Sequence, residues 1–221
     1  LVTAVSRRTL PEETVRRLVD RTDGWAVGLQ LAAISLQRAE DPEVCVAEFV
    51  GSDRLVAEYL TEEVLGRQDA AARRFLLDTS VLPWLSADLC DAVTGGGDSR
   101  AQLRRLSEQS LFLVPLDRSG DRFRYHHLFA DLLRYQLQVE RPDDVRGLRV
   151  LAAGWLRAHG AHADAIGEYL AAGEPLAALD VLDSVSQGYF ERGESATLVQ
   201  WFAAIRAAAD PAPVAVEINL L

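Results

Sequence analysis

An all-α fold, interrupted by one small β-hairpin and continued by antiparallel helix pairs, is the architecture that the sequence predicts. Apolar residues recur at the three- and four-residue spacing of amphipathic helices over most of the chain. This spacing breaks at only one place, near residues 111–126, where two short apolar stretches flank a turn-like segment. Beyond residue 141 the chain becomes Ala-rich, and short Gly-containing breaks separate segments of helix length.

Five helices are predicted in the first 80 residues. The sequence Thr9-Leu-Pro-Glu12 has the form of a capping box, and Asp23-Gly24 is typical of a helix end. Side chains that cap helix N-termini mark several of the later starts. The predicted helices cover residues 11–22, residues 25–38, a segment starting at Asp41-Pro42, a segment from Ser52 or Asp53 to Gly66, and residues 69–79.

A winged helix is predicted next, because helices followed by a two-stranded hairpin and a further helix occur in that order. Ser86 should cap a helix ending at Val93, and Gly95-Gly96-Gly97 separates it from a helix over 99–109. The remaining elements are strands over 111–116 and 122–126, a turn over 117–121, and a helix over 127–139.

The last part of the chain is predicted to form two antiparallel helix pairs. These pairs cover residues 144–159 with 162–171, and 175–190 with 195–208. Their pattern of small residues resembles tetratricopeptide-type repeats, in which small side chains let paired helices pack closely. Because a solenoid usually needs at least three repeats, the array is expected to continue past Leu221.

Length and composition indicate two or three subdomains in a piece of a longer protein. The chain has 221 residues, of which 49% are hydrophobic, but it contains no Met and begins at Leu1. The two cysteines, Cys45 and Cys90, are expected to be buried reduced thiols. No apolar run approaches the ~18 residues that span a bilayer, and no signal peptide is recognisable, so a cytoplasmic location is predicted.

Charge and motif content exclude several functions. A net charge of −10 argues against a chain that binds nucleic acid along its whole length. All 23 basic residues are Arg, so the Lys of the phosphate-binding motif G-x-x-x-x-G-K-[ST] is missing. No nucleophile elbow or H-E-x-x-H helix is present either, and no catalytic residue is predicted.

Two adjacent histidines, His126 and His127, stand where the wing meets the next helix. A helix N-terminus attracts anions, and an imidazole can donate a hydrogen bond to a phosphate oxygen. The alternative is that both histidines only cap the helix and pack against the wing. His127 and Asp131 could share a metal at i, i+4 spacing, but two ligands are too few, and no metal site is predicted.

Five ordered segments resemble the MalT-type branch of the LuxR-family transcriptional regulators, which are signal-transduction ATPases with numerous domains (STAND class). They are Asp23–Ala33, Asp53–Leu65, Phe75–Ser80, Leu111–Asp117 and Arg124–Arg134. The resemblance implies a helical domain at 1–66, a winged-helix domain at 67–140 and the start of a repeat sensor at 141–221. It also implies an ATPase core and a C-terminal helix-turn-helix, both outside this chain.

The resemblance further implies a nucleotide-contacting site. In the family, a His at the end of the wing touches the β-phosphate of ADP, and the Met-His-Asp-Leu motif aligns with Tyr125-His126-His127-Leu128. This alignment makes His126 the nucleotide-sensing residue, with the neighbouring His127 as its rival. The adenine-contacting motif Gly-Leu-Pro-Leu-Ala is similar to Gly28-Leu-Gln-Leu-Ala32, so Gly28 and Gln30 are expected near the adenine, with Gln30 replacing Pro.

The function expected is that of a non-catalytic regulatory segment in an ATP-dependent transcriptional regulator, coupling nucleotide state to effector sensing. ATP or ADP should bind the full-length protein, and no cofactor is expected in this fragment alone. Expected partners are a small-molecule inducer or regulatory protein at the repeats, DNA only through the C-terminal domain, and other copies on activation, but no membrane. The alternatives are another STAND-type protein or kinase scaffold, and a hydrolase or metalloprotein using His126, His127 and Asp131.

Overall fold

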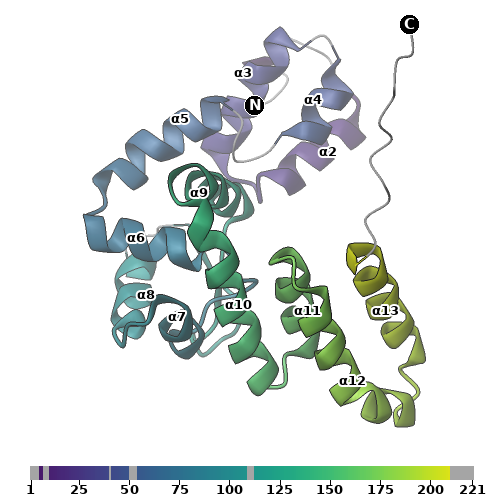
Figure 1. Ribbon diagram of the computed structural model, residues 1–221. Helices are drawn as coiled ribbons and strands as arrows, with labels where there is room; N and C mark the ends of the chain where they lie inside the picture. The colour runs from purple at the N-terminus through teal and green to yellow at the C-terminus, as the bar shows by residue number, and fades with distance from the viewer. Residues whose placement is uncertain (1–4, 7–9, 40, 50–53, 109–111, 210–221) are drawn as a thin grey trace, which may run out of the picture. The chain divides into compact units, whose positions relative to one another are not determined.

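The computed structural model describes residues 5–6, 10–39, 41–49, 54–108 and 112–209. Helices make up most of this part of the chain, and its only sheet has two strands (Figure 1). The predicted all-α class with one small β-hairpin is therefore confirmed. The chain divides into two compact units, Leu1–Pro142 and Asp143–Leu221.

The first unit contains the predicted helices, and most of them lie within two residues of the predicted bounds. Gly66, which was expected to end the fourth helix, lies instead in a short 3₁₀ helix that follows it. The elements are α2 (Glu12–Arg21), α3 (Ala26–Arg38), α4 (Pro42–Glu48), α5 (Arg54–Glu63), η1 (Leu65–Arg67), α6 (Ala70–Thr79), α7 (Ala87–Thr94), α8 (Ser99–Glu108), β1 (Leu113–Pro115), β2 (Phe123–Tyr125) and α9 (His127–Glu140).

Three helix starts are fixed by side-chain caps. Asp41, Asp69 and Ser86 each accept a hydrogen bond from a backbone N–H of the first turn, at 2.8, 2.8 and 3.3 Å. Each cap satisfies one of the N–H groups that a helix start leaves without an intrahelical partner. The other proposed capping residues, Thr9, Ser52 and Asp53, lie outside the described residues.

The wing is a short antiparallel pair in which Leu113 faces Tyr125 and Pro115 faces Phe123. Both strands are shorter than predicted. Phe112 has a φ of +52°, which departs from extended backbone, and His126 is already the N-cap of α9. Leu85 forms an additional bridge to Phe123 through two backbone hydrogen bonds of 2.7 and 2.9 Å, and this bridge was not predicted.

The core of the first unit is centred on α9, which contacts α5 and α6 (Figure 1). Phe129, Leu132 and Leu133 on this helix are fully buried. The hydroxyl of Tyr125 lies 2.7 Å from Thr79 Oγ1, and this bond satisfies two buried polar groups. Helix α9 therefore packs both against α5, which precedes the predicted winged helix, and against α6 within it.

The second unit contains helices joined by short turns, at the positions expected from the sequence. Gly160 and Gly173 have φ values of +77° and +73°, a left-handed backbone that glycine adopts without steric cost at the ends of helices. The buried residues Ile166, Val181 and Ile205 belong to the core of this unit. Its helices are α10 (Pro142–Ala158), α11 (His162–Ala171), α12 (Pro175–Glu191) and α13 (Ser195–Ala209).

The structure does not test two of the predictions about domain organisation. The boundary between a helical domain and a winged helix at residues 66 and 67 is not tested by the division of the chain into two units. The assignment of the helix pairs to tetratricopeptide-type repeats is likewise an expectation. No described helix is both long enough and apolar enough to cross a membrane.

The two cysteines are free thiols, but only Cys90 is fully buried. Burial, with a smaller contribution from Asp91, raises the pKa of Cys90 to about 12. At pH 8 only about one Cys90 in 10⁴ is then the reactive thiolate. We expect Ellman's reagent to titrate Cys45 in the folded chain and both thiols in denaturant, and a Cys45→Ser variant to react only when unfolded. Rapid reaction of folded Cys45→Ser would contradict the burial of Cys90.

Candidate functional site

A tight turn after α2 forms one side of the candidate site. The Thr22 hydroxyl donates to the Leu18 carbonyl at 3.0 Å, and the chain then reverses through Asp23 and Gly24, with φ values of +46° and +71°. Aspartate and glycine are among the residues that tolerate this left-handed backbone. The backbone N–H of Trp25 donates to the Thr22 carbonyl at 2.7 Å and closes the turn.

His126 forms the other side of the site at the N-cap position of α9. Its ring is buried, with 7% of the residue exposed, and Nε2 lies 2.9 Å from the Thr22 carbonyl, to which it donates. Its Nδ1 is also buried and has no hydrogen-bond partner in the described part of the chain. His126 makes no side-chain capping bond to α9, so its ring contacts the turn after α2 and does not cap its own helix.

Aromatic rings enclose His126. Trp25 and Phe112 both contact the imidazole edge-on, with ring centroids at 6.1 and 5.8 Å, and they contact each other at 5.1 Å. A Cβ atom on Gly28 would lie 2.4 Å from Trp25 Cε3, so only glycine leaves room for the indole at this position. The apolar enclosure accounts for the low exposure of the His126 ring.

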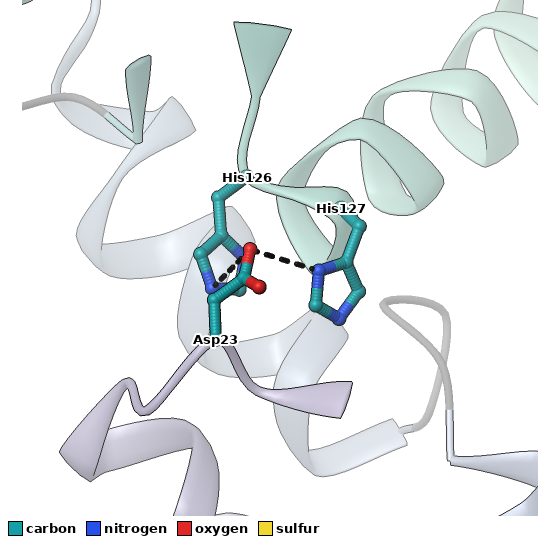
Figure 2. A group of neighbouring side chains, drawn as sticks. All are labelled: Asp23, His126 and His127. Atoms are coloured by element: carbon teal, nitrogen blue, oxygen red, sulfur yellow. Dashed lines mark hydrogen bonds and ion pairs between the residues drawn. The ribbon is translucent and has the colours of Figure 1, made fainter. Parts of the chain in front are cut away.

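His127 lies against His126 and reaches a carboxylate on the turn. The two imidazoles stack with centroids 4.7 Å apart and planes at 18°. His127 Nδ1 is 3.2 Å from Asp23 Oδ2 (Figure 2). Its Nε2 contacts the Arg21 carbonyl. Arg124 Nη2 donates to the same Asp23 oxygen at 3.2 Å. Asp23 therefore receives contacts from both β2 and α9.

Burial and pairing set the charges of this cluster. Burial lowers the pKa of His126, and the hydrogen bond to Thr22 only partly opposes that shift, so the ring is neutral at pH 7. Partial burial by itself would raise the pKa of Asp23, but the bonds from Arg124 and His127 outweigh it and lower the pKa. The cluster thus combines an ionised carboxylate with a neutral buried imidazole.

The structure brings together some of the predicted site residues and separates others. His126 and His127 lie side by side, whereas Asp131 pairs with Arg134 at 3.0 Å. Gly28 packs against Trp25, and Gln30 is exposed on α3. Asp23 was interpreted as part of a helix end and as the start of a family-like segment, and nothing in its local sequence indicates a histidine partner more than 100 residues away.

Comparison with known proteins agrees with this architecture. Residues 61–145 match the family model of the MalT winged helix domain. The chain is also 36% identical to the HTH-type transcriptional regulator MalT of Klebsiella pneumoniae, over 86% of this chain and 21% of that protein. The chain is MalT-like.

Two further relatives, a second MalT and a protein kinase, are similar to this chain over most of its length. The MalT of Serratia proteamaculans is 37% identical over 82% of this chain and 20% of its own length. The serine/threonine-protein kinase PknK of Mycobacterium tuberculosis is 32% identical over 86% of this chain and 17% of its own length. The chain spans about a fifth of the length of these relatives.

The candidate site joins the MalT winged helix domain to the helices before it. Arg124, His126 and His127 lie within the matched residues 61–145, whereas Thr22 and Asp23 precede them. A change in the position of the winged helix relative to α2 and α3 would therefore break these contacts first.

Proposed function

We propose that this chain is a non-catalytic regulatory segment of an ATP-dependent transcriptional regulator, in which nucleotide state controls the winged helix and an effector acts through the helix pairs. Its similarity to two MalT regulators over more than four-fifths of its length supports this function. The observation that carries the proposal is the buried His126, whose Nδ1 has no hydrogen-bond partner among the described residues.

The surroundings of His126 suit a phosphate group. Helices α3 and α9 begin at Trp25 and His126, whose rings contact each other. Neither helix has a side-chain cap or an acidic residue in its first turn, so their backbone N–H groups and positive dipole ends favour an anion. In this proposal, His126 senses the β-phosphate of ADP, His127 supports it by pairing with Asp23, and α3 lies near the adenine at Gly28 and Gln30.

The effector is proposed to act on the second unit. Large apolar side chains remain exposed on α12 and α13, among them Leu176, Phe190, Val199 and Phe202. Exposed apolar side chains of this size are typical of surfaces that bind a ligand or another protein. A small-molecule inducer or a regulatory protein would bind there, and DNA would be bound only by a helix-turn-helix domain outside these 221 residues.

His126→Ala in the full-length protein tests the nucleotide-sensing role. If the imidazole bonds to ADP only when the winged helix is closed over it, its removal shifts the equilibrium toward the open state. A hydrogen bond to a charged group contributes about 1.5–3 kcal/mol, so inducer-independent transcription should rise by about ten- to a hundredfold. A reporter assay and retention of ADP after purification measure the effect.

Two control variants separate the possible results of that experiment. His159→Ala removes an exposed histidine in the second unit and should leave basal transcription unchanged. His127→Ala should have a smaller effect than His126→Ala. If His127→Ala releases ADP while His126→Ala does not, His127 is the sensor. If neither changes ADP retention or transcription, the histidines have only a structural role.

A second candidate is a regulatory segment attached to a protein kinase. The 32% identity to PknK over 86% of this chain favours it, because the same region there belongs to a serine/threonine kinase. The sequence of the longer protein distinguishes the two candidates. A helix-turn-helix domain after residue 221 supports the transcriptional regulator, and a kinase domain in its place supports the second candidate.

A further inference from the structure

Asp23, His126 and His127 offer three ligand atoms that all lie within 4.8 Å of one another. Two imidazoles and one carboxylate are a ligand set that zinc binds in proteins. Figure 2 shows the three side chains converging from the turn after α2 and from the start of α9. We infer that this cluster is a Zn²⁺ site that links the turn to the winged helix.

The hydrogen bonding of His127 directs its Nδ1 toward Asp23. Its Nε2 faces the Arg21 carbonyl, which can only accept, so Nε2 carries a hydrogen. The other ring nitrogen, Nδ1, faces Asp23 Oδ2 at 3.2 Å, so both atoms can contribute to one metal ion. The bond from Nε2–H to a backbone carbonyl is also the second-shell contact that orients a metal-binding histidine.

The distances to Asp23 are close to those of a zinc site, and a turn of one imidazole ring would complete it. Zinc–nitrogen and zinc–oxygen bonds near 2.05 Å place tetrahedral ligand atoms about 3.3 Å apart. Asp23 Oδ2 and His127 Nδ1 are already 3.2 Å apart, and His126 Nε2 is 3.9 Å from the same oxygen. His126 Nε2 therefore needs to approach Asp23 by less than 1 Å. Because the two imidazoles stack with their planes at 18°, one ring must also turn so that both lone pairs point at the same ion. The fourth zinc position is then left for water.

His126 can supply its ligand atom without leaving a new polar group unsatisfied. Binding through Nε2 replaces its hydrogen bond to Thr22 and moves the hydrogen to Nδ1, which has no partner in the described structure. The Thr22 carbonyl keeps its bond from the Trp25 N–H.

Arg124 is the group that opposes the metal. Its guanidinium donates to Asp23 Oδ2 at 3.2 Å and would lie close to a divalent cation. Removing this positive charge should strengthen metal binding, whereas it should weaken the binding of a phosphate at the same place. This opposite effect makes the zinc site testable separately from the nucleotide-sensing role proposed above.

Co²⁺ is the probe for the experiment, because its visible absorption reports nitrogen and oxygen coordination. The purified 221-residue chain, freed of metal by a chelator, is titrated with Co²⁺ and then with Zn²⁺ as competitor. We expect one Co²⁺ per chain, displaced by one Zn²⁺. His127→Ala and Asp23→Asn should weaken binding by at least about a hundredfold, more than the loss of a second-shell partner costs. Arg124→Gln should tighten it by about tenfold at low salt.

Circular dichroism establishes that each variant is folded, and His159→Ala controls for binding by an unrelated surface histidine. The inference is overturned if the chain takes up no Co²⁺. It is also overturned if His127→Ala and Asp23→Asn bind Co²⁺ as tightly as the parent chain, or if Arg124→Gln weakens binding. None of these results depends on whether His126 senses ADP.

Discussion

Phe129→Ala is expected to lower the free energy of unfolding of the first unit by about 3–5 kcal/mol. The ring is fully buried on α9, and it packs against Phe112 and Tyr125 with centroids at 5.3 and 5.8 Å. Truncation removes this apolar contact and leaves a cavity where the wing meets α9, which the surrounding helices can only partly fill. Urea denaturation followed by circular dichroism measures the loss.

Tyr135→Ala is the matched control, because Tyr135 lies on the same helix with 52% of its surface exposed. Substitutions at such positions usually change stability by no more than about 0.5 kcal/mol. Amide hydrogen exchange shows which helices Phe129→Ala destabilises. Protection of backbone amides should fall in α5, α6 and α9 and remain unchanged in α11 to α13. A loss below about 1 kcal/mol for Phe129→Ala would mean that α9 is not the centre of this core.

The helices were predictable because their determinants are local. Asp41 and Ser86 cap helices at the positions that their side chains indicated, since an N-cap bond spans only two or three residues. The helical spacing of apolar residues likewise needs no knowledge of what the helix packs against. Element type and order therefore followed from the sequence.

The strand ends were less predictable, because the neighbouring structure sets them. Phe112 is apolar and continues the strand-like pattern, yet its φ of +52° keeps it out of the ladder and places its ring against Trp25 and His126. His126 similarly completes an alternating pattern but serves as the first cap position of α9. At both positions a tertiary contact overrides the local preference.

The candidate site was predictable only in part. The pair His126-His127 stood out by its position between a strand and a helix, and the family resemblance directed attention to it. Asp23 and Thr22 lie more than 100 residues earlier, and their hydrogen bonds to the histidines depend on how the turn after α2 meets α9. Sequence spacing along one helix made Asp131 a conceivable metal-sharing partner of His127, which was judged insufficient, and Asp131 pairs with Arg134 on its own helix.

Ile166→Ala is expected to lower the free energy of unfolding of the second unit by about 2–5 kcal/mol, a large part of what such a small unit can have. Ile166 is 2% exposed and belongs to a core that α11, α12 and α13 share, together with Ala178, Val181, Leu182 and Ile205. The small Ala178 lets the helices approach closely, so the lost side chain cannot be replaced by a neighbour without moving a whole helix.

The location of the lost protection shows whether the second unit unfolds independently or together with the rest of the chain. Amide hydrogen exchange in Ile166→Ala should lose protection over residues 162–209, while α5, α6 and α9 keep theirs. Leu176→Ala is the control, because this side chain on α12 is 77% exposed and its truncation should change stability by no more than about 0.5 kcal/mol. If Ile166→Ala destabilises both units equally, the two units on either side of Pro142 do not unfold independently. An effector bound to the helix pairs would then act on the winged helix through one folding equilibrium that both units share.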